Sequence, residues 1–142
     1  MKIQVQKVRD VKLPEKLSDS AACFDLFVPD DTYVVITPNS KGKIKLGIKT
    51  ELPEGYSAEM FIRSGKASDG LILVNSVGII DNDYRGEWVA VVFNYGHSNF
   101  PVNGGDRVLQ FRLVKDIENV EVIESDVLST TNRDNGGFGS TG

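Results

Sequence analysis

The sequence has very few of the residues on which several classes of site depend. Its 142 residues include one cysteine, Cys23, and one histidine, His97. A lone cysteine excludes an intramolecular disulfide framework, and one residue of each kind is too few for the usual zinc ligand set. We therefore expect Cys23 to be a reduced, buried thiol and His97 to lie in a surface turn.

Basic charge and long apolar runs are also scarce. The formal net charge is −4 and the pI is about 5.0, whereas a non-specific nucleic-acid or membrane surface needs a basic face. No stretch reaches the roughly 18 apolar residues that span a bilayer, and no signal-peptide pattern is present. We expect a cytoplasmic protein, in the host cell cytosol if it is viral, with no nucleic-acid or membrane partner. Positive charge that binds an anionic ligand must then be local.

Helical periodicity is nearly absent, and short β-rich runs separated by turn residues take its place. Alternating runs at 3–8 and 43–49 predict half-buried strands. Other apolar runs predict strands at 33–36, 56–62, 71–74, 88–93, 108–114 and 120–123. One helical turn is expected at 65–69. The length suits one domain, and the pattern predicts an all-β barrel or sandwich.

Glycine gathers at the end of the chain, in 133–142. Four glycines in the seven residues 136–142 leave backbone N–H groups free to converge on an anion, and Phe138 offers an aromatic face that the arm cannot bury locally. Such an arm would take its order from a ligand. By themselves the same residues also fit a frayed tail or a linker.

A polar cluster, Asp81-Asn82-Asp83-Tyr84-Arg85-Gly86-Glu87, lies between two apolar runs. Alone it fits an acidic turn, because aspartate and asparagine are common turn residues. The preceding residues, 75–80, are largely apolar and contain Asn75 and Gly78. They suggest a hairpin that presents its backbone, and a glycine at 78 would let a ligand approach closely.

Five segments, in order along nearly the whole chain, resemble the five motifs of the trimeric dUTP diphosphatases (dUTPases). They are Ala22-Cys23-Phe24-Asp25-Leu26, Arg63-Ser64-Gly65-Lys66-Ala67, 78–87, Gly105-Asp106-Arg107-Val108-Leu109-Gln110, and 133–142. The third and fifth are long enough to be specific, whereas the others are weak alone. The resemblance implies an all-β, distorted jelly-roll (β-clip) barrel over residues 1–131. It also implies a flexible, glycine-rich arm over 132–142 that closes over the active site.

The resemblance implies an enzyme that hydrolyses dUTP to dUMP and pyrophosphate by attack of water on the α-phosphorus. Asp81 would orient and deprotonate this water, a role worth about 10²–10⁴ in rate. Tyr84 would pack against the deoxyribose and exclude a 2′-hydroxyl. Asn75 and the backbone around Gly78 would read the uracil edge, because rigid backbone groups distinguish its carbonyls from the amino group of cytosine.

The phosphates would be bound by residues of three motifs. The groups implied are Ser64, the Gly65 amide, the main chain near Gln110, and Arg133, which can grip the terminal phosphate in bidentate fashion. Gln110 would also hold the water. Arg63 and Arg107 would each neutralise phosphate or hold loop carboxylates in place, and for Arg107 we favour the second role. Asp25 resembles the family's metal-side carboxylate, acting on Mg²⁺ mostly through water.

The arm would complete the site. Phe138 would stack over the uracil while glycines such as Gly139 let the backbone wrap the triphosphate, which excludes water and sets the geometry for in-line attack. The resemblance also implies a homotrimer with sites shared between subunits. Four residues depart from the family pattern, namely Cys23, Lys66, Trp88 and Asp134. Asp134 stands in place of a glycine and is able to pair with Arg133.

Two other functions fit parts of the sequence. A dCTP deaminase of the same fold would need a glutamate base in the strand after the third motif, and Val89-Ala90-Val91-Val92-Phe93 contains no carboxylate. Zinc deaminases are excluded because their H-x-E and P-C-x-x-C ligands are absent. A regulatory protein switched by a nucleotide is the second alternative, in addition to catalysis rather than in its place.

Overall fold

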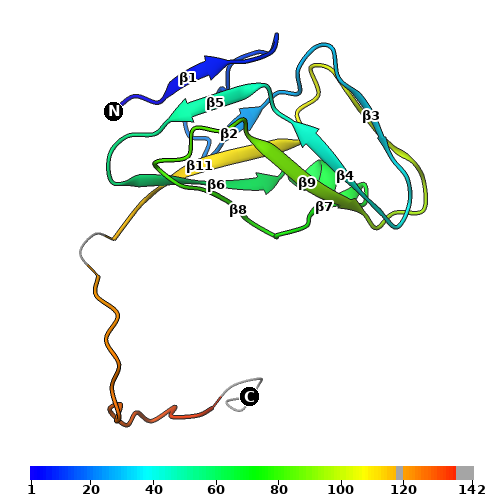
Figure 1. Ribbon diagram of the computed structural model, residues 1–142. Coiled ribbons are helices and arrows are strands. Elements are labelled where there is room, and N and C mark those ends of the chain that lie inside the picture. Colours follow the sequence, from blue (N-terminus) through cyan, green and yellow to red (C-terminus); the bar gives the residue numbers. More distant parts are fainter. Residues whose placement is uncertain (118–119, 137–142) are drawn as a thin grey trace.

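The computed structural model describes residues 1–117 and 120–136. Within these ranges the chain folds into antiparallel strands and one short helix, in the arrangement of Figure 1. The elements are β1 (Gln4–Lys7), β2 (Phe24–Leu26), β3 (Tyr33–Ile36), β4 (Ser40–Lys45), β5 (Ile48–Glu51), β6 (Tyr56–Ile62), α1 (Ser64–Ser68), β7 (Leu71–Leu73), β8 (Gly78–Ile80), β9 (Val89–Asn94), β10 (Phe100–Asn103) and β11 (Leu109–Lys115). The prediction of an all-β chain is confirmed. Among the described residues, no helix is both long enough and apolar enough to cross a membrane.

The largest sheet has the strand order β2-β11-β6-β8 and is called the site sheet below. A second sheet has the order β4-β9-β7, and two strand pairs, β1-β5 and β10-β3, complete the barrel. Every pairing between these strands is antiparallel. Neighbours in the site sheet come from distant parts of the chain, so this sheet brings separate sequence motifs side by side.

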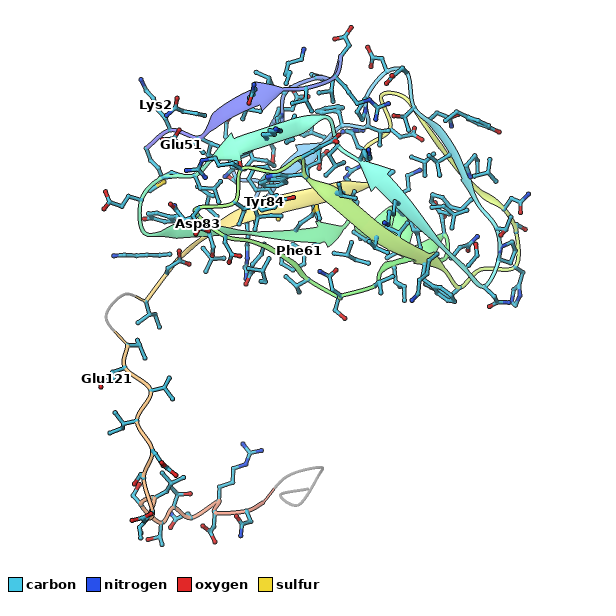
Figure 2. All side chains as sticks on the ribbon, viewed as in Figure 1. Lys2, Glu51, Phe61, Asp83, Tyr84 and Glu121 are labelled. Carbon is cyan, nitrogen blue, oxygen red and sulfur yellow. The ribbon has the colours of Figure 1, made fainter. Side chains whose placement is uncertain are left out.

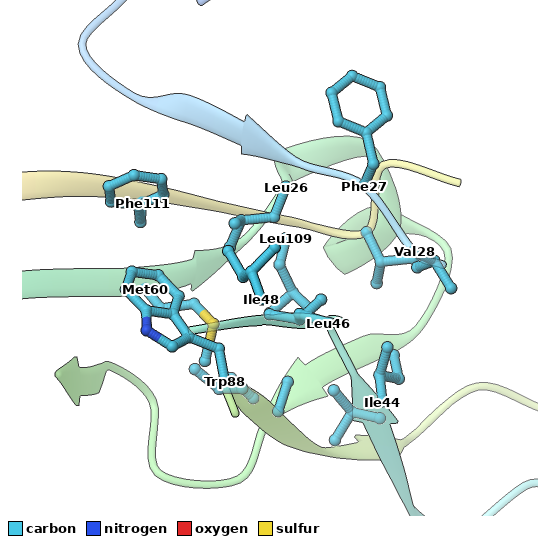
Figure 3. Packing of buried hydrophobic residues seen from close by; sticks show 14 of the residues in the cluster. Leu26, Phe27, Val28, Ile44, Leu46, Ile48, Met60, Trp88, Leu109 and Phe111 are labelled. Carbon is cyan, nitrogen blue, oxygen red and sulfur yellow. The ribbon is translucent and has the colours of Figure 1, made fainter. Parts of the chain in front are cut away.

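One hydrophobic core lies between the sheets (Figure 3). Alternate residues of the strands face it, such as Met60 of β6 and Phe111 of β11. Trp88 is fully buried and packs edge-on against Phe111, with ring centroids 5.1 Å apart. Its indole N–H donates to Oγ1 of the buried Thr50 at 3.1 Å, so this polar pair is satisfied. Trp88, which departs from the family pattern, is therefore a core residue.

The predicted strands at 33–36 and 56–62 have the bounds that the sequence indicated. The single strand predicted at 43–49 is wrong, because Gly47 takes a φ of +67° and the turn around it separates β4 from β5. The strand predicted at 120–123 is also wrong, since these residues form none. The sequence pattern did not predict β10, which contains Pro101, a residue that disfavours strands. It is accommodated in a two-stranded sheet, where each strand has a free edge.

After β11 the chain leaves the barrel (Figure 1). Asp116 is anchored by its N–H, which donates to Gly55 O at 2.9 Å, and by its carboxylate, which accepts from Ser57 Oγ at 2.7 Å. The described residues 120–136, called the arm segment below, run away from the barrel, and Figure 2 shows Glu121 on this course. Val122 of the segment is 95% exposed. The predicted boundary between 131 and 132 stays a prediction, and the strands end earlier, at Lys115.

Candidate active site

The outer face of the site sheet collects residues from separate motifs. Directly opposite residues of an antiparallel pair project to the same face. Gln110 of β11 lies opposite both Asp25 of β2 and Phe61 of β6. Leu109, the neighbour of Gln110 in the strand, is buried on the core side. The structure thus places Asp25 and Gln110 side by side on one face.

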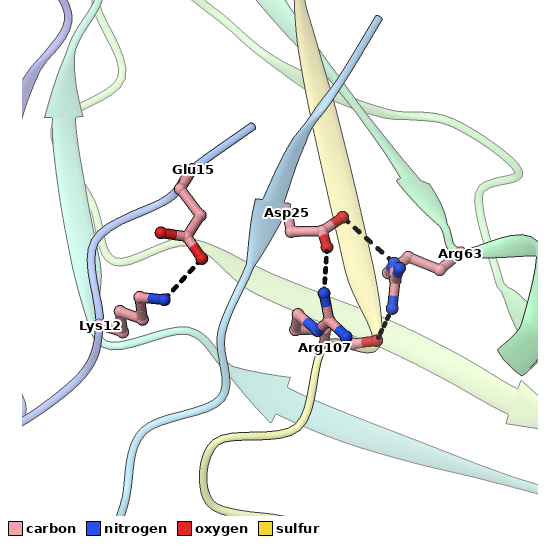
Figure 4. A network of polar contacts seen from close by, with 5 residues as sticks. All are labelled: Lys12, Glu15, Asp25, Arg63 and Arg107. Atoms are coloured by element: carbon pink, nitrogen blue, oxygen red, sulfur yellow. Dashed lines mark hydrogen bonds and ion pairs between the residues drawn. The ribbon is translucent and has the colours of Figure 1, made fainter. Parts of the chain in front are cut away.

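Asp25 is the centre of an ion-pair cluster (Figure 4). Its Oδ1 lies 3.1 Å from Nε of Arg63, and its Oδ2 lies 3.2 Å from Nη1 of Arg107. The Asp25 side chain is only 9% exposed, whereas those of Arg63 and Arg107 are 31% and 38% exposed. Two cations and one anion give the cluster a net charge of +1. Because each guanidinium has five N–H donors, the cluster supplies local positive charge in an acidic protein.

The cluster bears on two predictions. Arg107 holds a carboxylate, which is the structural role we favoured, and Arg63 does the same. Each oxygen of Asp25 is already in an ion pair, so a metal contact through water stays a prediction. In the described part of the chain, no group of three or more His, Cys, Asp or Glu side chains is placed to hold a metal ion. Cys23 is half-buried rather than buried.

Ser64 and Gly65 begin α1, directly after β6, and both are exposed. A Cβ built on Gly65 would meet no atom within 4 Å. The fold therefore does not itself require glycine at this position. Lys66, next in the helix, is half-buried and its Nζ lies 5.6 Å from the centre of the Phe100 ring. This amine is directed at an aromatic face.

Asn75 and Gly78 line an apolar pocket of about 300 Å³ whose walls include Val89 and Val91. The residues before Gly78 do not form the expected hairpin. β7 pairs with β9 and β8 pairs with β6, so the connection between them passes from one sheet to the other. Ser76 at its tip has a φ of +61°, in the left-handed region.

Gly78 has a packing reason to be glycine. A Cβ on this residue would lie 2.9 Å from Cε of Met60, which faces the core from the neighbouring strand. The missing side chain thus leaves room for the core, and close approach of a ligand to the Gly78 backbone stays a prediction. The sequence pattern did not distinguish these two reasons, because Met60 is distant in sequence.

The loop 81–87, called the Asp81 loop below, follows β8 directly. Asp81 is exposed. The side chain of Asn82 fixes the loop to the turn between β5 and β6, because its Nδ2 donates to Pro53 O at 2.7 Å and to Tyr56 O at 2.9 Å. Asn82 was predicted only as a turn former. Its partners lie more than 25 positions away, so no local pattern indicated this contact.

The second half of the Asp81 loop is also fixed by hydrogen bonds. Nη1 of Arg85 donates to Asn82 O at 2.6 Å and to Tyr84 O at 3.2 Å. The Tyr84 hydroxyl donates to Glu87 O at 3.0 Å, and the Glu87 carboxylate accepts from the N–H of Gly47 at 3.0 Å. The cluster that fits an acidic turn by composition is therefore a loop with its own set of anchors.

Asp81 and Ser64 lie at opposite ends of β6. Ile80 is opposite Ala58 in the ladder, so Asp81 is level with Ser57. Ser64 stands beyond the other end of the strand, which finishes at Ile62. Seven positions at about 3.3 Å each separate the two by roughly 20 Å. Within one chain the two residues therefore cannot contact the same phosphate.

A family model for dUTPase matches residues 9–142. The chain is 43% identical to the deoxyuridine 5′-triphosphate nucleotidohydrolase of Hydrogenobaculum sp. (strain Y04AAS1), over 100% of this chain and 99% of that protein. It is 40% identical to the protein of the same name from Helicobacter pylori (strain ATCC 700392 / 26695), over 100% and 97%. The chain belongs to the dUTPase family. The resemblance carried by the five motifs is confirmed.

Solved dUTPase structures share the fold. The Staphylococcus bacteriophage 80alpha dUTPase, a mutant with dUpNHpp, superimposes with a TM-score of 0.88 at 23% identity, over 99% of this chain and 98% of that one. A mutant dUTPase from phage phi11 of Staphylococcus aureus superimposes with a TM-score of 0.79 at 22% identity, over 89% and 98%. The predicted jelly-roll fold is confirmed.

The described arm segment, 120–136, of this dUTPase-family chain runs away from the barrel (Figure 1). Arg133 is exposed, and its Nε donates to Gly136 O at 3.0 Å, within the arm segment itself. Asp134 has a φ of +41°, a left-handed value that favours glycine, the residue that the family pattern has here. Phe138 and Gly139 lie outside the described residues. Their predicted contacts with the nucleotide stay predictions.

Proposed function

We propose that this protein hydrolyses dUTP to dUMP and pyrophosphate. The observation that supports this most strongly is the anchored Asp81 loop. The loop begins directly after Ile80, which lines the same pocket as Asn75 and Gly78. Asp81 therefore follows directly on a residue of a pocket with apolar walls, and Tyr84 is three positions further along the same loop. Relatives at 40% identity or more over the whole chain bear the name of this activity.

The base and the sugar would be recognised by the same short stretch of chain. Uracil enters the pocket between Val89, Val91 and the backbone of Gly78, and Asn75 with the neighbouring main chain reads its polar edge. Apolar walls favour a flat, neutral ring, and fixed backbone groups select its pattern of donors and acceptors. Tyr84 packs on the deoxyribose. Asp81 accepts a proton from the water that attacks the α-phosphorus.

The phosphate end of the site would come from another copy of the chain. Ser64, Gly65, Gln110 and the Asp25 cluster lie toward the far end of the site sheet from Asp81, so a second subunit must bring its own set beside the first subunit's Asp81 loop. A closed homotrimer supplies three such sites by symmetry. Gln110 positions the water, and the guanidinium of Arg63, with its spare N–H donors, faces the phosphate oxygens while Arg107 holds Asp25.

Mg²⁺ would enter with the triphosphate. The mutant dUTPase of phage phi11 coordinates a structural Mg(II) ion, and Mg²⁺ characteristically keeps several waters while it binds substrate phosphates. Asp25 suits this way of binding Mg²⁺. Both of its oxygens are already in ion pairs, so it would contact waters of the ion and not the ion itself. When bound, the ion neutralises phosphate charge. Arg133, Phe138 and Gly139 of the arm would then close over the nucleotide and exclude water.

A substrate panel tests the activity. With Mg²⁺, purified protein should release pyrophosphate from dUTP much faster than from dCTP, dTTP or UTP. Asp81→Asn should lower kcat by about 10²–10⁴ and leave binding of a non-hydrolysable dUTP analogue largely intact. Turnover of this variant at the wild-type rate would remove Asp81 from its role as base. Ammonia released from dCTP instead would mean deamination.

Subunit mixing tests the shared site. Asp81→Asn and Ser64→Ala should each be impaired alone, and trimers reassembled from an equal mixture should regain activity. Each site then draws an intact Asp81 with probability one half and an intact Ser64 with the same probability, so about one quarter of the sites are complete. Each variant reassembled with itself is the control. No recovery in confirmed mixed trimers would place both residues in one subunit's site.

Gly65→Ala tests the approach of phosphate to the α1 backbone. The added methyl group has open space in the folded chain, so the melting temperature should not fall, while the affinity for nucleotide should fall about tenfold because the methyl occupies phosphate space. Ser68→Ala, an exposed change in the same helix, is the control. Unchanged affinity for both variants would show that phosphate does not approach Gly65.

A further inference from the structure

We propose that Gly86 positions the ring of Tyr84 and thereby sets the discrimination between deoxyribose and ribose. The proposal rests on the proposed function, because it assigns a specificity role at the same site. It concerns a residue for which the sequence pattern indicated no role. The observation behind it is that the position a side chain would occupy at Gly86 is taken by the phenol of Tyr84.

A Cβ built on Gly86 would lie 2.5 Å from Cζ and 2.9 Å from Cε2 of Tyr84, and would also collide with the hydroxyl oxygen. Real Cβ atoms do not tolerate such distances. Gly86 is half-buried, whereas Tyr84 is 42% exposed, so the ring rests against the Gly86 backbone and keeps exposed surface. An open aromatic surface of this kind suits packing against a sugar.

The phenol of Tyr84 is also held by a hydrogen bond. Its hydroxyl donates to Glu87 O at 3.0 Å. Glu87 is itself fixed to the turn around Gly47, because its carboxylate accepts a hydrogen bond from the Gly47 N–H at 3.0 Å. The next residue, Trp88, donates its N–H to Ile48 O at 2.9 Å. The ring therefore lies against Gly86 while its hydroxyl is bonded to the anchored residue that follows Gly86.

This placement gives the ring its selectivity. A pocket rejects a ligand with one added hydroxyl by a factor of only roughly 10². To reach that factor against a 2′-hydroxyl, the aromatic face must stand at a fixed distance from the sugar. A ring displaced by one methyl group loses that fit. Alanine at 86 is compatible with the backbone, because Gly86 is not one of the glycines with a positive φ angle. The expected damage is confined to the exposed ring.

The experiment compares kcat/KM for UTP and dUTP in wild type, Gly86→Ala, Tyr84→Ala and the double variant, each checked by circular dichroism and thermal melting. Gly86→Ala should raise the UTP-to-dUTP ratio of kcat/KM at least about tenfold. Tyr84→Ala should raise it similarly. The double variant should match Tyr84→Ala, since a residue that acts through the ring has no further effect once the ring is gone.

The outcomes separate the inference from the function on which it rests. A wild-type ratio in folded Gly86→Ala, or additive effects in the double variant, would overturn the role of Gly86 while leaving the activity in place. Wild type without dUTP turnover would remove the proposed function itself. If Gly86→Ala does not fold, Gly86→Ala with Tyr84→Ala must fold, because the clash is absent there. Failure of both to fold contradicts the proposal.

Discussion

The Asp81 loop and the arm segment both lack regular structure, and they are held in opposite ways. The Asp81 loop is tied at three places to the barrel or to itself, by Asn82, by Arg85 and by Glu87. The arm segment hydrogen-bonds within itself at Arg133 and Asp134, and its apolar residues such as Val122 are exposed.

The difference fits the roles proposed for the two stretches. In the proposed mechanism Asp81 and Tyr84 act through fixed distances, which an anchored loop would provide before the substrate binds. An arm that covers a site must leave it again, and anchors to its own barrel would oppose that movement. The proposed function thus calls for a preorganised loop in one place and a movable arm in the other.

The largest effect is expected from deletion of the residues proposed to cover the site. Truncation after Thr131 deletes Arg133 and Phe138 and should lower kcat/KM for dUTP at least about 100-fold, because the site stays open to water. The melting temperature should stay within about 1 °C, since the hydrogen bonds of Arg133 and Asp134 lie within the arm segment. Activity assay and differential scanning calorimetry measure both. Full activity of the truncated chain would mean that 132–142 is a linker.

A smaller effect is expected when an anchor of the Asp81 loop is removed. Asn82→Ala breaks the bonds to Pro53 O and Tyr56 O and should destabilise the fold by about 1–3 kcal/mol. It should also lower kcat about tenfold while KM for dUTP changes little, because the base loses its fixed position. Denaturant unfolding and steady-state kinetics provide the measurements. Asn99→Ala, at an exposed asparagine, is the matched control, and equal behaviour of the two variants would refute the anchoring role.

The smallest effect is expected within the arm segment. The closed arm is expected to need the left-handed backbone for which the family pattern has glycine, and a non-glycine residue there costs about 1–2 kcal/mol. Asp134→Gly should therefore let the arm close more readily and lower KM for dUTP about twofold. Asp126→Gly, in the same segment but without a positive φ, should leave KM unchanged or raise it. Matching decreases in both variants would point to the lost negative charge instead of the backbone.

Sequence reasoning reached most of the fold and only part of the site. Alternation predicted the strands at 33–36 and 56–62 with their bounds, because burial of every second side chain is a local pattern. It failed at 43–49, where Gly47 turns the chain within an alternating run. In the site, the motifs indicated Asp81 and Tyr84 by type, but carried no sign that Asn82 fixes their loop to the turn before β6. That contact depends on partners more than 25 positions away, which the motif pattern does not specify.

By itself, the sequence determined that this chain is all-β and that it belongs to the dUTPase family, because hydrophobic periodicity and motif order are properties of the linear chain. The tertiary structure decided which groups meet. Asp25 lies between Arg63 and Arg107, which are 38 and 82 positions away, only because β2, β6 and β11 are neighbours in one sheet. The register of β6 with β8 likewise separates Asp81 from Ser64. Strand order and register arise from the packing of the whole core, which no single segment encodes.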